Sequence, residues 1–463
     1  MHLFPSVPTQ QASAQTPMDR DRIVDAARAI SLLLVVAGHA VMGVVWWQHD
    51  SIKLGNLLAA FPWTQLVTWL LQISPLFFFA GGAANAISWD KHVKRNGTYA
   101  NWMWLRTQRL LRPLWAYLIF AGFLAGFFTS FTDSKVTAPL MSLSTQLIWF
   151  LGCYLFVTAL APLFIQATPW RGALMTFGLI AASGLVDGVW LFASWPKAVA
   201  LLNFVLVWSV PAYLGSLRAR GTLARYSRKL LWSVVIMDLI INALLIKFGP
   251  WPLSLVGMPG EPISNMAPPT IVLALHSLTL VCLVTLFNVP LTRTLARPKV
   301  WRRITGINLV AMTLYLWHLP VLAVLFTASH FLGWERSTKL GNSGYPIPNG
   351  WGYLLGSLGF WAAFAFMVWA IVRFLWPLEH GALPWWDSAP QSKPPEKRAA
   401  NILVGVGSAG AGIAMLILSA TGLDGFPAKV AHYAGIPMNS AAAIAFLVGS
   451  GALIRWSGAV RSN

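Results

Sequence analysis

The sequence is poor in charged residues. Asp, Glu, Lys and Arg make up 10% of its 463 residues, whereas soluble domains carry about 25%. Hydrophobic residues make up 57%, and a soluble fold of this size cannot hide so much apolar surface, because part of any folded surface must face water. The composition therefore excludes an ordinary soluble domain and favours a protein whose solvent is the lipid bilayer.

Several chemical motifs are also missing. Only two cysteines occur, Cys153 and Cys282, and both lie in apolar stretches without Cys-x-x-Cys spacing, so we expect neither a disulfide framework nor a bound metal. There is no Gly-x-Ser-x-Gly elbow and no Walker loop, so covalent serine catalysis and nucleotide hydrolysis have no support. The first 20 residues lack the basic start and apolar core of a signal peptide, and we interpret them as a disordered cytoplasmic tail.

Long hydrophobic runs account for most of the chain. A membrane-spanning helix needs about 20 mostly apolar residues. We therefore predict an all-α fold, a polytopic transmembrane helical bundle of about twelve helices, in which a ten-helix core precedes two C-terminal helices. The expected spans are 26–47, 62–87, 110–131, 144–166, 172–193, 199–217, 230–248, 268–289, 306–330, 351–378, 401–422 and 437–456.

The positive charges alternate from one connection to the next. When the N-terminus is placed in the cytoplasm, 26 of the 33 Lys and Arg fall on the cytoplasmic side and seven on the other. This asymmetry predicts a multi-pass protein of the inner (plasma) membrane with both termini in the cytoplasm. The formal charge of +19 does not indicate a nucleic-acid partner, because the Lys and Arg lie in short runs between apolar stretches.

A polar, proline-rich stretch near the C-terminus marks a domain boundary. Residues 386–399 have the composition of a linker. We predict a working body over 21–380, a linker over 381–400 and a two-helix appendage over 401–463, whose glycines and alanines allow helices to pack closely.

The first span holds the densest group of ionisable residues. Arg28 and His39 are eleven residues apart, about three helical turns, so both project from one face, and His39 lies about 16 Å deeper. Asp25 is one turn before Arg28 and can pair with it. Ionisable side chains inside a span are functional candidates, and an imidazole suits proton transfer near pH 7. The alternative is a histidine that only hydrogen-bonds a neighbouring helix.

Three arginines recur every three residues at the start of the third span. Arg106, Arg109 and Arg112 share one side of a helix at the predicted cytoplasmic interface. Guanidinium groups match phosphate oxygens, so one interpretation is a phosphate-binding site. The other is a topology anchor that reaches lipid headgroups.

A second histidine stands in the ninth span. His318 is followed by Pro320, which removes a backbone donor and is expected to kink the helix there. A kink beside a histidine suits a polar cavity, and a packed aromatic belt around one buried His is the alternative. Asp238 is the only acid that we expect deep in a span.

Four stretches together resemble the acyltransferase-3 family of integral membrane O-acyltransferases. They cover roughly residues 20–380, and their order on successive helices makes the match specific. At position 81 this chain has Gly where the family often has Ser. The stretches are Arg28 and His39 preceded by Asp25, the Phe-rich run Phe77–Gly82, Arg106-x-x-Arg109, and Tyr315-Leu-Trp-His318-Leu-Pro320.

The resemblance implies an acyl-CoA donor, with acetyl-CoA expected, and a carbohydrate, glycolipid or other hydroxylated acceptor at the bilayer. It implies that Arg28 and His39 are essential site residues and that Arg106 and Arg109 bind the donor. We hypothesise that His39 is the general base, that Asp25 and Arg28 orient the cytoplasmic mouth, that Arg112 joins the other two arginines on the donor phosphates, and that His318 lines the acceptor side.

Two other classes of function stay open at this point. Twelve helices with both ends inside is also a transporter layout, so a transporter or flippase of a polar lipid or glycan is the alternative, although the internal repeats typical of transporters are not visible. A structural or regulatory membrane protein is a third, in which His39 and His318 could be replaced without loss.

Overall fold

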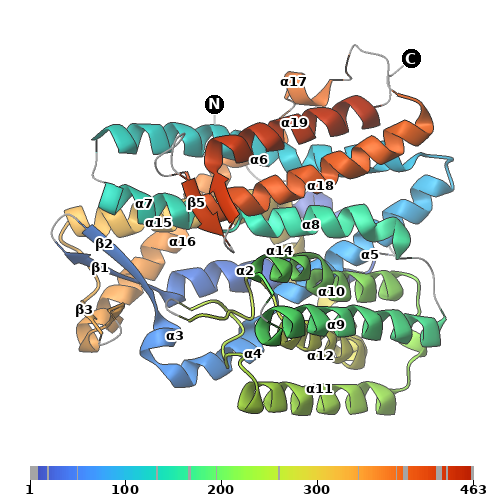
Figure 1. The fold of residues 1–463 in the computed structure, drawn as a ribbon, viewed down its shortest axis with the longest axis horizontal. Helices are drawn as coiled ribbons and strands as arrows, with labels where there is room; N and C mark the ends of the chain where they lie inside the picture. The colour runs from blue at the N-terminus through green and yellow to red at the C-terminus, as the bar shows by residue number, and fades with distance from the viewer. Residues whose placement is uncertain are drawn as a thin grey trace.

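The computed structural model describes residues 9–17, 20–48, 51–131, 134–164, 168–193, 195–258, 261–341, 344–381, 383–388, 390, 395–423, 430–433 and 436–459. Within them, eleven helical stretches are long and apolar enough to cross a membrane, and one pair of helices bent by 68° makes a twelfth if it is counted as one span. The long helices lie side by side along the long axis of the molecule (Figure 1). The predicted polytopic helical bundle is confirmed.

The bundle consists of long helices and shorter connecting elements. The long helices are α2 (Arg22–Met42), α5 (Ser74–Val93), α6 (Tyr99–Phe131), α8 (Ile148–Leu160), α9 (Pro169–Phe192), α10 (Asn203–Ala219), α11 (Arg228–Phe248), α12 (Ile271–Leu286), α15 (Ala311–Phe331), α16 (Gly350–His380), α18 (Lys397–Thr421) and α19 (Ser440–Gly458). The shorter ones are α1 (Thr9–Ala14), α3 (Leu57–Ala60), η1 (Pro62–Val67), α4 (Thr68–Leu71), α7 (Ser134–Thr145), η2 (Ala161–Leu163), η3 (Lys197–Leu202), η4 (Leu223–Arg225), α13 (Asn288–Leu295), α14 (Pro298–Leu309) and α17 (Pro384–Asp387).

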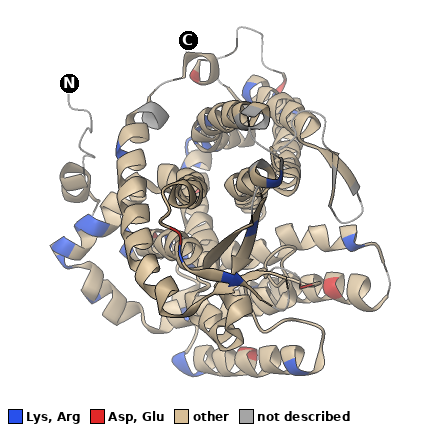
Figure 2. Cartoon of the chain, turned by 90° about the vertical axis from the view of Figure 1, so that its left-hand side faces the viewer, with Lys and Arg blue, Asp and Glu red and all other residues tan. Residues whose placement is uncertain are grey.

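Three antiparallel hairpins connect helices. They are β1 (Gly43–Gln48) with β2 (Ser51–Asn56), β3 (Thr338–Leu340) with β4 (Pro346–Pro348), and β5 (Val430–Tyr433) with β6 (Ile436–Asn439). We call the end of the bundle that carries β1–β2 and β3–β4 the hairpin end. It is on the left of Figure 1 and faces the viewer in Figure 2, where many helices are seen nearly end on.

Ion pairs tie helix ends together at the opposite end, which we call the basic end. Arg218 pairs with Asp21 at 2.6 Å, and Arg220 pairs with Asp90 at 2.9 Å. These contacts join the start of α2, the end of α5 and the end of α10. The chain of α2 therefore begins at the basic end and leads into the hairpin end through β1.

Three span boundaries differ from the sequence prediction. The span predicted over 26–47 ends at Met42, because the β-branched and aromatic residues that follow pair as strand β1. The span predicted over 62–87 is interrupted at Gln72 and Ile73, between α4 and α5. The span predicted from residue 110 belongs to a helix that already begins at Tyr99, so Arg106 lies about two turns inside it rather than at its start.

Glycines allow α5 and α10 to pack with their backbones in contact. A Cβ atom at Gly82 would lie 1.9 Å from the Ala212 carbonyl oxygen, and one at Gly215 would lie 1.9 Å from the Phe79 carbonyl oxygen. Real Cβ atoms do not approach so closely, so both positions require glycine. This contact fixes where the N-terminal half of α5 stands in the bundle.

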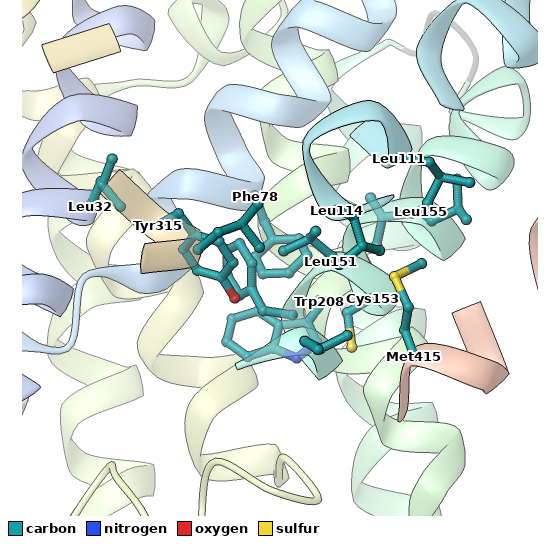
Figure 3. Close-up of a cluster of buried hydrophobic side chains, with 14 of the residues drawn as sticks. Leu32, Phe78, Leu111, Leu114, Leu151, Cys153, Leu155, Trp208, Tyr315 and Met415 are labelled. Atoms are coloured by element: carbon teal, nitrogen blue, oxygen red, sulfur yellow. The ribbon is translucent and has the colours of Figure 1, made fainter. Parts of the chain in front are cut away.

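The two C-terminal helices belong to the same core as the body. Met415 of α18 is fully buried and lies beside Cys153 and Leu155 of α8 (Figure 3). The C-terminal half of α18 therefore packs against α8 of the body.

The polar segments on either side of the body also pack on it. In the predicted linker, Trp386 of α17 is buried and donates its Nε1–H to the Gln108 carbonyl at 3.1 Å. In the predicted tail, residues 9–14 form α1, and the Thr16 hydroxyl accepts a hydrogen bond from Trp301 at 3.0 Å.

Candidate active site

A large cavity lies between the second half of α2 and the hairpin end. Its volume is about 910 Å³, and His39 is among the side chains that line it. Its walls come from α2, the base of hairpin β1–β2, the segment from α3 to the start of α5, the junction of α7 and α8, the start of α10, residues 256–258 and 261–267, α15 and the end of α18. The cavity thus gathers the ends of segments that are far apart in the sequence.

The two predicted histidines meet at the wall of this cavity. His318 Nε2 lies 3.2 Å from His39 Nδ1, and the two ring centroids are 5.3 Å apart. His318 is fully buried, whereas His39 is partly exposed toward the cavity. Since 278 residues separate them in the chain, only the packing of α15 on α2 creates this pair.

Hydrogen bonding assigns the protons on the two rings. His318 Nδ1 lies 3.0 Å from the Leu314 carbonyl oxygen and 2.8 Å from the Tyr315 carbonyl oxygen, and carbonyls only accept, so Nδ1 carries the proton. Its Nε2 is then a lone pair that accepts the Nδ1–H of His39. In the neutral ring of His39 this leaves Nε2 unprotonated. The carbonyl of Val35 is a further partner of the His39 ring and likewise requires a ring N–H.

Arg28 and Asp25 lie at the basic end and are joined to α14. Arg28 Nε donates to Asn308 Oδ1 at 2.7 Å, and Asn308 Nδ2 donates to the Asp25 carbonyl at 3.0 Å. The Asp25 carboxylate lies 3.8 Å from Arg28 and 2.5 Å from Arg20. Neither residue lines the cavity, so the structure separates this network from His39 although all three residues share α2.

The three arginines of α6 have different surroundings. Arg112 pairs with Asp387 at 2.6 Å, which ties α6 to α17. Arg106 contacts the Ala84 carbonyl of α5 at 3.4 Å and lies over the Trp102 ring, 5.8 Å from its centroid. Arg109 is exposed. Among the residues that the structure describes, neither Arg106 nor Arg109 has a carboxylate within ion-pair distance.

The interruption between α4 and α5 is a feature that the sequence analysis missed. The carbonyl of Ile73 accepts the Ser31 hydroxyl at 2.8 Å, and the carbonyl of Gln72 lies 3.1 Å from His276 Nε2. The Ile73 carbonyl also accepts the backbone N–H of Leu76 at 2.9 Å, so Ser31 adds a second hydrogen bond there, while His276 bonds the Gln72 carbonyl. Irregular backbone inside a membrane needs such partners. Two features of the sequence could have predicted the interruption. Gln72 is a polar residue in mid-span, and Pro75 favours the first turn of a new helix.

A second missed feature is a buried acid in α9. Asp187 accepts hydrogen bonds from Asn203 Nδ2 at 2.9 Å, Trp251 Nε1 at 3.3 Å and the backbone N–H of Ile271 at 2.8 Å. The expectation of Asp238 as the only deep acid is therefore wrong. Asp187 joins α9, α10 and the start of α12, while Asp238 joins α11 and α12 by accepting the Thr279 hydroxyl at 3.0 Å.

A buried arginine closes the hairpin end of the cavity wall. Arg336 donates to the Gly43 carbonyl at 2.7 Å and to the Tyr353 hydroxyl at 3.0 Å, and it lies 4.1 Å from the Phe360 ring centroid. Burial lowers the pKa of its guanidinium. Gly43 lines the cavity, so Arg336 holds the strand that forms this part of the wall.

Position 81 also has a structural explanation. A Cβ atom at Gly81 would lie 2.5 Å from the Tyr154 ring. A serine, which the acyltransferase-3 family often has here, would therefore displace that tyrosine. No group of three or more His, Cys, Asp or Glu side chains suited to a metal ion is found within the described ranges.

Comparison with known proteins gives one match. No curated protein and no solved structure matches the chain. The model of a family described as an acyltransferase domain, acyltransferase-3, matches residues 21–376, a range that includes His39, His318 and the three arginines of α6. The chain therefore belongs to the acyltransferase-3 family, and it is a multi-pass membrane acyltransferase.

Proposed function

We propose that the protein transfers an acyl group, with acetyl expected, from acyl-CoA to a hydroxyl of a carbohydrate, glycolipid or other small acceptor. The observation that carries the proposal is the His39–His318 pair. Its hydrogen bonds leave the Nε2 lone pair of His39 available beside a cavity large enough for a substrate. A base with a free lone pair is what attack by an alcohol requires.

In the proposed reaction His39 is the general base. Its Nε2 takes the proton of the acceptor hydroxyl as the oxygen attacks the thioester carbonyl, so that a C–O bond forms. The tetrahedral intermediate collapses by breaking the C–S bond, and the CoA thiolate leaves with the proton that His39 returns. His318 is a positioning residue that holds His39 in the tautomer with the proton on Nδ1.

The start of α5 is our candidate for stabilising the oxyanion. Ser74 and Phe77, in the first turn of α5, line the same cavity as His39. Pro75 has no N–H and the N–H of Leu76 donates to the Ile73 carbonyl at 2.9 Å, so the positive potential here comes mainly from the dipole of α5. Positive potential near the developing oxygen charge lowers the barrier of acyl transfer.

Arg106 and Arg109 are our candidates for binding the CoA phosphates. Both belong to the basic part of α6, and neither guanidinium is neutralised by a carboxylate among the described residues. Two adjacent cations without an acid attract a polyanion. Arg112 is paired with Asp387, so the proposal for the phosphates depends mainly on the other two.

We propose a topology in which both termini and the basic end are cytoplasmic, in the plasma membrane. The excess of Lys and Arg in alternate connections supports this orientation. Acyl-CoA would then approach from the basic end, where Arg28 and Asp25 hold α2 against α14, and the cavity would lie toward the outer leaflet.

The test uses purified protein in nanodiscs with radiolabelled acetyl-CoA and a panel of hydroxylated acceptors. We expect acetylated product from the wild type, a loss of about 10²–10⁴-fold for His39→Ala, and no loss for His432→Ala, a matched change at an exposed histidine of β5. A near wild-type rate in His39→Ala protein that folds normally would contradict the assignment. A transporter or flippase, the alternative function, would move substrate in the same nanodisc lipids reconstituted as vesicles without forming acylated product.

A further inference from the structure

The cavity beside His39 is much larger than an acetyl group and an attacking hydroxyl require. Its volume of about 910 Å³ is near the top of the range of about 300–1,000 Å³ seen for small-molecule sites. Leu, Val, Phe, Met and Ala side chains form most of its wall. The site is therefore shaped for a ligand with a substantial hydrocarbon part.

Most polar side chains of the wall already use their protons within the protein. Five hydroxyl groups on four segments donate to backbone carbonyls and so have no proton to offer a ligand. These groups cannot replace the donors that water supplies to the many oxygens of a sugar, and losing such hydrogen bonds is costly. The five bonds are Ser31 to Ile73 at 2.8 Å, Thr64 to Phe61 at 2.5 Å, Thr68 to Gln65 at 2.5 Å, Tyr315 to Leu147 at 2.5 Å and Ser419 to Gln146 at 2.6 Å.

The charges around the cavity assign it to the acceptor rather than to CoA. Among the described residues that line it, Glu261 is the one Asp, Glu, Lys or Arg. A carboxylate at the wall repels phosphates. Arg106 and Arg109 do not line the cavity, so the donor's phosphates have no partner inside it.

The cavity is separated from lipid by a thin wall. In the segment formed by η1 and α4, Trp63, Leu66 and Leu70 are 68%, 59% and 77% exposed and do not line the cavity, while Thr64 and Thr68 of the same segment do. The segment thus has one face toward the bilayer and one toward the cavity. On this side one segment stands between the cavity and a ligand that is dissolved in lipid.

We propose that the acceptor is a lipid alcohol, whose hydroxyl meets Nε2 of His39 and whose hydrocarbon chain fills the cavity. This inference rests on the proposed acyl transfer and names the substrate class of the same site. Because the wall is apolar, the affinity for the alcohol should rise with the length of its chain, by about fourfold for each added methylene. The rise should stop once the chain fills the cavity.

The first experiment measures acetyl transfer to 1-alkanols of two to fourteen carbons, with glucose as an acceptor without a chain. We expect kcat/KM to rise with chain length and then level off. Ala420→Phe places a ring in the cavity from α18, so the plateau should move to shorter alcohols. Ala409→Phe, at an exposed position of the same helix, should leave the plateau in place, which controls for partition of the alcohols into lipid.

The outcomes separate the inference from the proposed function. If glucose and ethanol are acetylated as well as decanol, the inference fails while the acyltransferase proposal stands. If kcat/KM depends on the length of the donor's acyl chain and not on the length of the alcohol, the cavity holds the donor, and the inference also fails.

A second experiment needs no turnover. Decanol carrying a photoreactive diazirine in its chain should label peptides containing residues 143–150 or 416–420, less so in Ala420→Phe. Labels confined to Trp63, Leu66 and Leu70, which are exposed and do not line the cavity, would overturn the inference, whatever the outcome of the activity assay.

Discussion

Replacement of His318 by leucine should slow acyl transfer through its effect on His39. The ring of His318 accepts the Nδ1–H of His39 at 3.2 Å, and leucine removes this partner, which leaves the Val35 carbonyl as the remaining partner of the His39 ring. Loss of one hydrogen bond costs about 0.5–1.5 kcal/mol, and without His318 the other tautomer of His39, which has no lone pair toward the cavity, becomes more populated. If the whole cost appears in the barrier, kcat falls by between about twofold and about 13-fold.

The assay is transfer of labelled acetyl from acetyl-CoA by purified variants in nanodiscs, with thermal unfolding as the check on folding. The side-chain oxygen of glutamine can occupy the position of the imidazole Nε2, so His318→Gln should recover part of the rate that His318→Leu loses. Because His318 acts through His39, the double variant His39→Ala/His318→Leu should be no slower than His39→Ala alone.

Two results would refute this reasoning. One is a His318→Leu protein as fast as the wild type. The other is a double variant in which the two losses multiply, since this would mean that His318 contributes to the reaction independently of His39.

Three further predictions concern the acyl donor and the packing. Arg106→Ala should raise the KM for acetyl-CoA by about 10–100-fold, which corresponds to the free energy of one hydrogen bond to a charged group, and should leave kcat little changed. An unchanged KM would exclude a role in donor binding. Arg112→Ala and Asp387→Ala should each lower the stability measured by unfolding in detergent. The double variant should show a coupling energy of about 0.5–3 kcal/mol, and additive effects would mean that the ion pair does not contribute to stability. Gly215→Ala should destabilise the protein by about 1–3 kcal/mol or more, because its Cβ meets the backbone of α5. The control Gly178→Ala, which has open space around its Cβ, should be neutral or slightly stabilising. Equal effects of the two changes would contradict the close packing of α5 and α10.

Much of the fold could be predicted from local sequence. A run of about 20 apolar residues has few options in a bilayer other than a helix, because each backbone N–H and C=O must be bonded internally. The described residues hold eleven candidate spans, or twelve if the bent helix pair is counted as one span, against about twelve predicted. The errors lie in span boundaries, where tertiary contacts or turn chemistry determine where a helix ends. Strand β1 replaces the end of the first predicted span because it pairs with β2, and the gap at Gln72 and Ile73 persists because Ser31 and His276 bond its carbonyls.

For the candidate site too, the sequence identified the residues and only the tertiary structure showed their contacts. Sequence alone singled out His39, His318 and the arginines of α6 as ionisable residues at places where charge is costly, and it identified the family. It could not show that His39 and His318 touch, that Arg28 is bonded to Asn308 away from the cavity, or that Arg112 is neutralised by Asp387. Hydropathy and motifs depend on residues near each other in the chain, whereas these contacts join residues more than 270 positions apart and arise only when the helices pack.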